Sequence, residues 1–377
     1  MRILLLGDYS NVHHTLGQGL RRLGHEVVVA SDGDGWKNYP RDVDLRRSTL
    51  SPWGSAVYFL RLLHKFRHFR GFDVVQLINP VFLPLKAERM MPFYRYLRRH
   101  NRHIVLGAFG MDYYYVKACL DFRTFRYSDF NMGSRERISE ENEIFKRDWL
   151  YGPKGRLNRA LAADADAIVS GLYEYEVSYR AQCPQATGKL HFIPFPIIFR
   201  QPDAQTEVPN SPTNPLKIFI GIQKTRSVYK GTDIMLRAAR RVAEQYPDAC
   251  RLQVAQNVPF AQYVEMLNTS NVLLDQLYSY TPAMNALEAM ARGMIVVGGG
   301  EPESYDLLGE KELRPIVNVA PNEESVYQAL CQLVEQRASL VPRLREESLR
   351  YIHRHHDYVT VARRYEKLYR QLDICRS

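Results

Sequence analysis

The sequence has few cysteines, and no pattern connects them. Its five cysteines are scattered along the chain and form no Cys-x-x-Cys pair; they are Cys119, Cys183, Cys250, Cys331 and Cys375. An odd, dispersed set argues against both a disulfide framework and a zinc site. We therefore expect reduced thiols in a cytoplasmic protein, most of them small core residues.

Long hydrophobic runs are also missing. No stretch approaches the ~18 to 20 consecutive apolar residues that a membrane-spanning helix needs. The apolar run near the N-terminus ends in Gly7-Asp8 and is too short for the core of a secretory signal. We therefore expect a cytoplasmic protein that is not integral to a membrane.

The chain has no low-complexity tract, and its composition is that of a folded protein. Of its 377 residues, 45% are hydrophobic and 24% are charged, which is enough for two domains with separate cores. The formal net charge is +10 and the sequence pI is about 9.3. A basic surface attracts nucleic acid, anionic lipid or a phosphorylated substrate, and charge alone does not choose among them.

Short apolar segments alternate with amphipathic helical segments along the chain. We predict strands at residues 2–7, 25–30, 73–78, 102–106, 165–169, 190–193, 217–221, 251–255, 271–275, 294–297 and 315–319. We predict helices at residues 12–23, 56–69, 85–99, 231–245, 260–268, 283–292, 323–338, 341–356 and 358–372. This alternation predicts an α/β protein with parallel, doubly wound sheets.

Two segments interrupt the alternation. Residues 194–215 are rich in proline and polar residues, which is typical of an interdomain linker. Residues 112–161 are irregular and contain many Tyr, Arg and Asp residues, so we expect a long loop with short helices there. Loops of that length often act as lids or binding segments.

The segment from Tyr280 to Glu301 carries the strongest functional signal. It reads Tyr-Thr-Pro-Ala-Met-Asn-Ala-Leu-Glu-Ala-Met-Ala-Arg-Gly-Met-Ile-Val-Val-Gly-Gly-Gly-Glu and follows a predicted strand. Ligands of open α/β sheets bind at the carboxyl ends of the strands, and a helix start attracts phosphate. Asn285 and Glu288 would lie in the first two turns of the next helix, where a carboxylate can accept two hydrogen bonds from a ribose diol.

The run Glu288-Ala-Met-Ala-Arg-Gly293, followed by Val296-Val297, resembles the donor site of retaining glycosyltransferases with the GT-B fold, the group 1 (family 4) type. In that family one Glu precedes the pattern by eight positions and contacts the donor sugar. The resemblance implies that Glu288 contacts the ribose of a nucleotide sugar. Tyr280 stands in the place of the first Glu. The alternative is a helix whose Ala and Met residues only pack.

A basic loop after the strand at 217–221 agrees with this resemblance. It contains Lys224, Arg226 and Lys230, and Lys230 is followed by glycine. The family has Gly-Arg and Lys-Gly here, and its Arg and Lys bind the donor diphosphate. The resemblance therefore assigns Lys230 to the diphosphate, with Lys224 or Arg226 in the place of the Arg. Cations there would stabilise the leaving diphosphate. The alternative is a solvated basic loop.

Loops after two strands of the N-terminal half supply candidates for the reacting end. His13 follows the first strand in a loop without a Gly-x-Gly-x-x-Gly fingerprint. It could bind a sugar hydroxyl or phosphate, or else be a capping or core histidine. Asp112 follows the fourth strand, where the family often has a His or Asp near the reacting sugar. We take Asp112 and His13 as the catalytic candidates.

We expect no metal and no cofactor apart from the nucleotide sugar itself as co-substrate. Asp32-Gly-Asp34 is similar to the Asp-x-Asp metal motif of the other main glycosyltransferase fold, but Asp-Gly after a strand is common turn chemistry. The run His353-Arg-His-His-Asp357 has no partner cluster, so packing or solvation is favoured over metal binding.

Two segments, residues 61–70 and 95–102, mix Arg and Lys with aromatic and aliphatic residues. An amphipathic basic helix can lie on an anionic membrane, and many enzymes of the family act on lipid-linked or envelope acceptors. These helices are therefore candidates for a peripheral contact with the inner face of a membrane. The alternative is a core-facing helix whose cations reach out to water.

The resemblance implies two Rossmann-like domains that face a cleft. Residues 1–205 would form the acceptor-side domain, residues 206–357 the nucleotide-sugar donor domain, and a helix in residues 358–377 would pack back on the first. The implied reaction is glycosyl transfer from a nucleotide-diphosphate sugar to a hydroxyl of a glycan or lipid-linked acceptor, in cell-envelope or polysaccharide synthesis. The family usually retains anomeric configuration without a metal.

Three other functions remain as hypotheses. A nucleotide-sugar 2-epimerase has the same fold and would change the donor without an acceptor. A non-catalytic nucleotide-sugar-binding homologue is suggested by Tyr280 in the place of the usual Glu. A nucleic-acid-binding protein is suggested by the charge alone, and because the sequence has no recognised nucleic-acid module we do not expect it.

Overall fold

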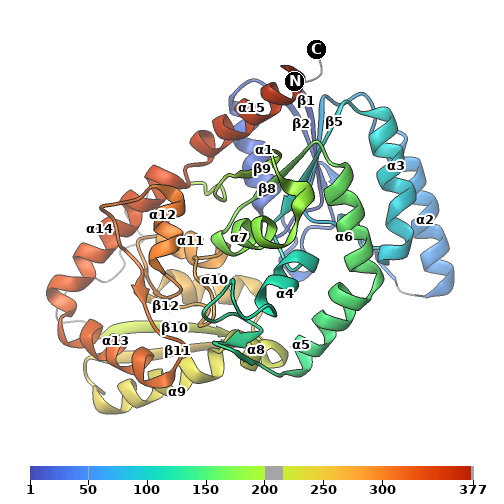
Figure 1. The fold of residues 1–377 in the computed structure, drawn as a ribbon. Coiled ribbons are helices and arrows are strands. Elements are labelled where there is room, and N and C mark those ends of the chain that lie inside the picture. Colours follow the sequence, from blue (N-terminus) through green and yellow to red (C-terminus); the bar gives the residue numbers. More distant parts are fainter. Residues whose placement is uncertain (50, 200–214, 375–377) are drawn as a thin grey trace. The chain divides into compact units, whose positions relative to one another are not determined.

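The structure, a computed structural model, describes residues 1–49, 51–199 and 215–374 (Figure 1). The chain divides into two compact units. Unit 1 contains Met1–Thr124, Ile144–Pro196 and Tyr358–Ser377, and unit 2 contains Phe125–Glu143 and Ile197–Asp357. Most of the predicted linker, residues 200–214, lies outside the described residues.

Unit 1 is built on a seven-stranded parallel sheet in the order β3-β2-β1-β4-β5-β8-β9. The strands are β1 Arg2–Leu6, β2 Glu26–Ser31, β3 Val43–Asp44, β4 Val74–Leu77, β5 His103–Ala108, β8 Ala167–Ser170 and β9 Leu190–Phe192. Ile3 to Leu6 are fully buried. Continuous burial is expected of a strand in a parallel sheet, because crossover helices cover both of its faces.

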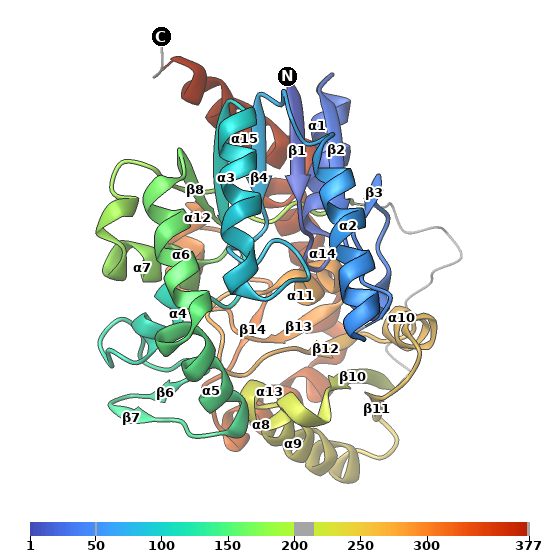
Figure 2. The same ribbon diagram turned by 90° about the vertical axis from the view of Figure 1, so that its right-hand side faces the viewer.

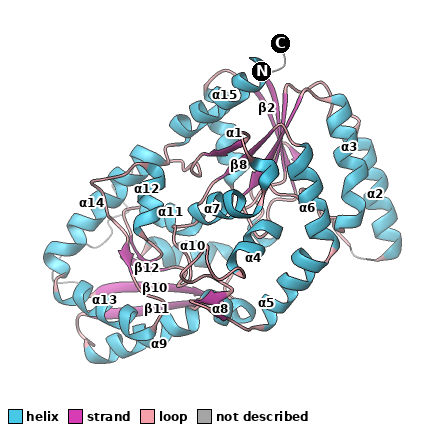
Figure 3. Cartoon of the chain, in the orientation of Figure 1, coloured by secondary structure: helices cyan, strands magenta, loops and turns pink. Residues whose placement is uncertain are grey.

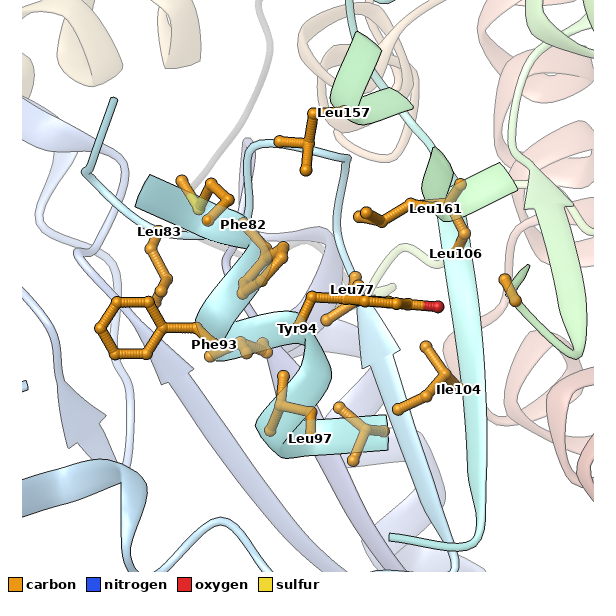
Figure 4. Close-up of a cluster of buried hydrophobic side chains, with 14 of the residues drawn as sticks. Leu77, Phe82, Leu83, Phe93, Tyr94, Leu97, Ile104, Leu106, Leu157 and Leu161 are labelled. Carbon is orange, nitrogen blue, oxygen red and sulfur yellow. The ribbon is translucent and has the colours of Figure 1, made fainter. Parts of the chain in front are cut away.

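The helices of unit 1 are α1 Val12–Arg22, α2 Pro52–Phe66, α3 Met90–His100, α4 Tyr113–Cys119, α6 Pro153–Asp164, α7 Tyr173–Gln182 and α15 Tyr358–Ile374. Phe93, Tyr94 and Leu97 of α3, Leu161 of α6 and Ile104 of β5 belong to one buried hydrophobic cluster, part of which is shown in Figure 4. Burial of such side chains contributes ~1.5 to 3 kcal/mol each.

The C-terminal helix α15 packs along α1 within unit 1. Gly19 of α1 permits this close approach, because a Cβ at that position would lie only 2.4 Å from the carbonyl oxygen of Tyr358 and 2.8 Å from the Cβ of Ala362. Any larger residue at position 19 would therefore push the two helices apart.

Unit 2 has a five-stranded sheet in the order β11-β10-β12-β13-β14, again parallel throughout. Figure 3 shows its strands in magenta. They are β10 Leu216–Ile222, β11 Cys250–Gln256, β12 Val272–Leu274, β13 Ile295–Gly298 and β14 Val317–Asn318. The helices are α8 Ser227–Lys230, α9 Thr232–Gln245, α10 Phe260–Asn268, α11 Met284–Met290, α12 Pro302–Leu308, α13 Glu323–Glu335 and α14 Arg337–His355.

The segment predicted as an irregular loop, residues 112–161, is more regular than expected. It contains α4, the antiparallel strands β6 Asn131–Met132 and β7 Arg135–Glu136, α5 Glu140–Phe145, a π-helical turn Lys146–Tyr151 and the start of α6 (Figure 2). Residues 125–143, which the sequence analysis placed in the first domain, cluster with unit 2. We call residues 125–143 the inserted segment.

The predicted helices differ from the observed ones at several ends. The helix predicted at residues 85–99 begins only at Met90, the one predicted at residues 56–69 runs from Pro52 to Phe66, and α7 was not predicted. The difference at residues 283–292 is smaller. The helix there is only Met284–Met290, because Gly293 adopts φ +77° and ends the turn. The following helix α12 was not predicted. Among the helices in the described parts of the chain, none has the length and apolarity needed to cross a membrane.

Candidate functional site

The topology of unit 2 creates one natural place for a ligand. After β10 the chain first forms β11 on one side of it and then β12 on the other. The loops that follow β10 and β12 therefore diverge at this switch point, where open α/β sheets bind ligands at the carboxyl ends of their strands. The first loop leads through the turn Lys224–Arg226 into α8, and the second runs from Asp275 to α11.

Lys230 and Asp275 lie together at this edge. Burial raises the pKa of the Asp275 carboxyl, and the nearby positive charge of Lys230 and a hydrogen bond from Asn285 oppose that shift. The backbone N–H of Leu277 donates to the Lys230 carbonyl at 3.0 Å and ties the two loops together. Gly231 adopts φ +72°, and a Cβ there would lie 2.7 Å from Leu277 and Tyr278. Glycine follows Lys230 because the backbone there adopts a left-handed turn and lies in tight contact with the second loop.

Asn285 and Glu288 lie one turn apart on α11. The Asn285 amide donates to Asp275 Oδ1 at 3.3 Å, and its oxygen accepts from the Tyr263 hydroxyl at 3.0 Å. The Glu288 side chain is 33% exposed, with one oxygen 4.0 Å from Arg292 Nη1. Burial first, and then the charges of Asp275 and Glu288, raise the pKa of Tyr263 to about 12. The structure therefore brings Lys230, Asn285 and Glu288 to one edge of the sheet.

The other two predicted diphosphate ligands belong to the turn after β10. Arg226 Nε lies 3.4 Å from Glu141 Oε1 in the inserted segment, and its guanidinium lies 5.2 Å from the Tyr229 ring centre. Lys224 begins the turn Lys224–Arg226, and its side chain lies outside the described part of the protein.

Tyr280, in the position of the family's first Glu, is only 2% exposed. Its ring centre lies 5.7 Å from that of Phe125 and 4.9 Å from that of Tyr127. Its hydroxyl accepts a hydrogen bond of 2.9 Å from the backbone N–H of Arg126. Tyr280 is therefore built into an aromatic contact with the inserted segment.

Glu301, which follows the three glycines after β13, joins the same contact. Its carboxylate accepts from the Tyr127 hydroxyl at 2.6 Å, from Arg126 Nη2 at 2.6 Å and from the Asn318 amide at 3.1 Å. Arg126 also pairs with Glu303. A Cβ at Gly299 would lie 2.0 Å from the Ser279 carbonyl oxygen, so the glycine allows the loops after β12 and β13 to touch.

His13 lies in the interior of unit 1. Its Nδ1–H donates to the Gly7 carbonyl at 2.6 Å, and its Nε2 accepts from Gln76 at 3.3 Å. Gln76 in turn accepts from the Tyr369 hydroxyl of α15 at 2.6 Å. Burial lowers the pKa of His13 to about 3, so the ring is neutral. These contacts match the core histidine that the sequence left open as an alternative.

Asp112 is fully buried and caps a helix. Its Oδ1 accepts from the Tyr115 N–H at 2.8 Å, and its Oδ2 accepts from the Tyr179 hydroxyl at 2.8 Å. Burial raises its pKa to about 7, against the effect of these hydrogen bonds. Asp112 and His13 therefore both have their hydrogen-bond partners in the interior of unit 1.

The two segments considered for metal binding have other contacts. Asp32 accepts from the N–H of Asp34, and Asp34 accepts from Ser10 N–H at 2.9 Å and Lys37 Nζ at 2.7 Å. His355 Nε2 lies 2.7 Å from Glu310 Oε2. Over the described ranges, no three His, Cys, Asp or Glu side chains gather as a ligand set.

A role for Tyr263 was not predicted, and residues 112–161 were expected only in general as a lid or binding segment, without the contacts that the inserted segment makes. Tyr263 of α10 supports Asn285 and lies against Gly221, where a Cβ would be 2.8 Å from its ring. The glycine at the end of β10 was a usable signal for a close neighbour. No local pattern signals that Arg126 and Tyr127 contact Glu301, because 174 residues separate Tyr127 from that carboxylate.

No protein-family model matches the sequence, and no curated protein matches it. Solved structures match over nearly the whole chain. The sucrose-phosphate synthase from Thermosynechococcus elongatus has a TM-score of 0.64 at 14% identity, with 100% of each chain covered. Anabaena HepE, solved in complex with UDP and glucose, has a TM-score of 0.58 at 11% identity, with 98% of this chain and 99% of that chain covered.

WaaG, a glycosyltransferase involved in lipopolysaccharide biosynthesis, has a TM-score of 0.55 at 12% identity, with 98% of this chain and 99% of that chain covered. At such identities the similarity concerns the fold. The predicted fold class is confirmed: the chain has the GT-B architecture, with two Rossmann-like α/β units.

Proposed function

We propose that the protein is a glycosyltransferase that transfers a sugar from a nucleotide-diphosphate sugar to an acceptor hydroxyl. One observation carries the proposal: Lys230, Asn285 and Glu288 lie along the edge of the sheet at the switch point of unit 2. A cation suits the diphosphate, and an amide and a carboxylate suit the ribose. HepE was solved with UDP, so UDP-sugars are the first donors to test.

In the proposed reaction the bond between the anomeric carbon and the diphosphate oxygen breaks, and the acceptor oxygen bonds to the anomeric carbon. The acceptor proton leaves with the nucleoside diphosphate. Lys230 stabilises the charge that grows on the diphosphate. Following the resemblance, we propose retention of configuration without a metal, in cell-envelope or polysaccharide glycan synthesis.

The buried Tyr280 favours one alternative, a homologue that binds the nucleotide without catalysis. Such a protein would bind a nucleotide sugar but neither hydrolyse nor transfer it. A 2-epimerase would instead change the donor when no acceptor is present. Analysing donor products with and without a mixed glycan acceptor pool separates these outcomes from transfer.

We expect UDP to raise the melting temperature of the wild-type protein and to raise that of Glu288→Ala much less. At a ligand concentration of about 100 Kd the stabilisation is ~2.7 kcal/mol, and loss of hydrogen bonds to a charged group removes ~1.5 to 3 kcal/mol of binding. The measurement is a thermal-shift panel of UDP, GDP, ADP and dTDP and their sugars.

Glu265→Ala is the matched control, because Glu265 is an exposed glutamate on the neighbouring helix α10. It should respond to the nucleotide as the wild type does. If no nucleotide stabilises the wild type, or if Glu288→Ala responds normally, the site assignment is wrong.

We also propose that α2 lies on an anionic membrane, as suits a lipid-linked acceptor. Its outer face exposes Trp53 by 80%, Leu60 by 66% and Leu63 by 44%, while Phe66 packs on Phe93 of α3 at 4.7 Å between ring centres. The exposed cations along and just after the helix are Arg61, Arg67 and Arg70. No acidic residue occurs between positions 51 and 70, so charge and apolar exposure both favour an anionic lipid surface.

We expect the protein to sediment with phosphatidylglycerol-containing vesicles and not with pure phosphatidylcholine vesicles. The double variant Trp53→Ala, Leu60→Ala should bind them at least about tenfold more weakly, because each exposed side chain contributes more than ~1 kcal/mol when it enters the interface. Tyr151→Ala, which removes an aromatic side chain that is 77% exposed in unit 1, is the control. Unchanged binding of the double variant would place the contact elsewhere.

A further inference from the structure

The inserted segment comes from the N-terminal half of the sequence but belongs to unit 2. It contacts the loops of the candidate donor site at two separate places. A role for the segment in that site rests on the proposed function.

The first contact is at the end that would hold the diphosphate. Arg137 Nη2 donates to the Val228 carbonyl at 2.8 Å, and Nη1 lies 3.4 Å from the Tyr229 carbonyl. Its guanidinium carbon lies 3.3 Å from the centre of the Tyr278 ring. Val228 and Tyr229 belong to α8, which ends at Lys230. Carbonyls at the end of a helix lack hydrogen-bond donors within the helix. The guanidinium of Arg137 supplies such donors to these two carbonyls.

Other contacts hold the segment there. The Tyr229 hydroxyl donates to Asp129 Oδ2 at 2.8 Å, and the Phe130 ring meets the Tyr229 ring edge-on at 6.2 Å. Arg137 Nη1 also donates to the Asp129 carbonyl at 2.6 Å. Arg137 therefore links the backbone of the inserted segment to the backbone just before Lys230.

The second contact is around Tyr280, which stands where the family that the sequence resembles has its sugar-contacting Glu. Arg126 and Tyr127 hold the Glu301 carboxylate, and Tyr280 packs on Phe125 and Tyr127. Tyr127 and Glu301 are both nearly buried, with exposures of 7% and 9%. The loops after β12 and β13 thus meet one aromatic and ionic cluster of the inserted segment.

We propose that the inserted segment is a positioning element of the donor site with two separable parts. Arg137 sets the position of Lys230 and so controls affinity for the diphosphate. Arg126 and Tyr127 hold Tyr280 and Glu301, at the place that the resemblance assigns to the sugar, and so control discrimination among sugars on one nucleotide.

The test is calorimetric titration of wild type and variants with UDP and with UDP-glucose. Arg137→Ala should weaken both ligands by about tenfold, the equivalent of ~1.4 kcal/mol, and leave the ratio of their affinities unchanged. The double variant Arg126→Ala, Tyr127→Phe should bind UDP within about twofold of wild type and change that ratio by at least about fivefold. Arg135→Ala, an exposed arginine of the same hairpin, should change neither.

Hydrogen exchange without ligand gives a second, independent readout. Arg137→Ala should speed amide exchange at residues 226–230 and not at residues 280–301, and the double variant should do the reverse. The proposal would be overturned if both variants lost UDP affinity equally, or if amide exchange became faster in all of these residues or in none. Either result would mean that the inserted segment stabilises unit 2 in general and does not position the two ends of the site separately. If the exchange pattern holds but wild type binds neither UDP nor UDP-glucose, the proposed donor fails and the positioning role stands.

Discussion

Replacing Lys230 with alanine is expected to lower kcat/KM for sugar transfer by about 10²- to 10³-fold. In other enzymes, a hydrogen-bond donor that stabilises charge developing as the bond breaks contributes that much to the rate. Lys230 is the cation that lies beside Asp275 at the switch point. The measurement is steady-state transfer from the UDP-sugar that the thermal panel identifies. Lys230→Arg should recover part of the loss.

Loss of folding must be separated from loss of catalysis in this variant. Without Lys230 the buried Asp275 carboxyl loses the charge that opposes its raised pKa, so the melting temperature should also fall. The double variant Lys230→Ala, Asp275→Asn should restore stability but not transfer. Lys311→Ala, an exposed lysine of unit 2, is the control. Wild-type transfer by Lys230→Ala would mean that the diphosphate is held elsewhere.

The second large effect concerns stability and lies at Glu310, after α12. This carboxylate is 1% exposed and lies 2.7 Å from His355 Nε2 and 3.0 Å from Arg354 Nη1. It also accepts from the N–H groups of Glu312 and Leu313. We expect Glu310→Ala to lower the free energy of unfolding by about 3 kcal/mol, because it removes the acceptor of two backbone N–H groups and of the buried His355 ring and also breaks the ion pair with Arg354.

A loss of that size should lower the melting temperature of a unit of this length by about 6 to 12 °C. The matched control is Glu312→Ala, because Glu312 is 70% exposed and contacts the same Arg354. It should change stability by less than about 1 kcal/mol. Equal effects of the two substitutions would show that the burial of Glu310 does not matter.

The pH dependence gives a second check on Glu310. Burial alone would raise its pKa, but hydrogen bonds from His355, the backbone and Arg354 lower it to about 2 from 4.5. A lowered pKa means that the stabilisation is complete above pH 4.5 and is lost as pH falls towards 2. The free energy of unfolding, measured with denaturant, should therefore fall more between pH 5 and pH 2 in wild type than in Glu310→Gln.

The elements that local pattern determines were predictable. Short apolar runs such as Ile218–Ile220 correspond to fully buried parts of strands, and the helix from residue 231 begins where Lys230-Gly231 allows a left-handed turn. The GT-B fold class followed from their alternation and the resemblance. The helix predicted at 283–292 ends two residues early, at Met290, because residues 291–293 form a turn that closes with Gly293 in a left-handed conformation.

Features that depend on distant contacts were not predictable in this way. Arg126 and Tyr280 are 154 residues apart, and neither has a local pattern that indicates the other. Asp112 and His13 were correctly placed after strands, but position after a strand does not tell whether a side chain points outward. Tyr179 and Gln76 satisfy them inside unit 1, and those partners became visible only in three dimensions.

The inserted segment also bears on how the chain folds during synthesis. The backbone passes between the units after Thr124, Glu143, Pro196 and Asp357, so neither unit is a continuous stretch of the gene. At ~5 to 20 residues per second, a ribosome adds Glu301 roughly 9 to 35 s after Tyr127, its partner 174 residues earlier. For most of that interval Phe125 and Tyr127 lack Tyr280 and Glu301, the residues they pack on or bond in the folded unit, and a fragment that ends at residue 197 would never contain these partners.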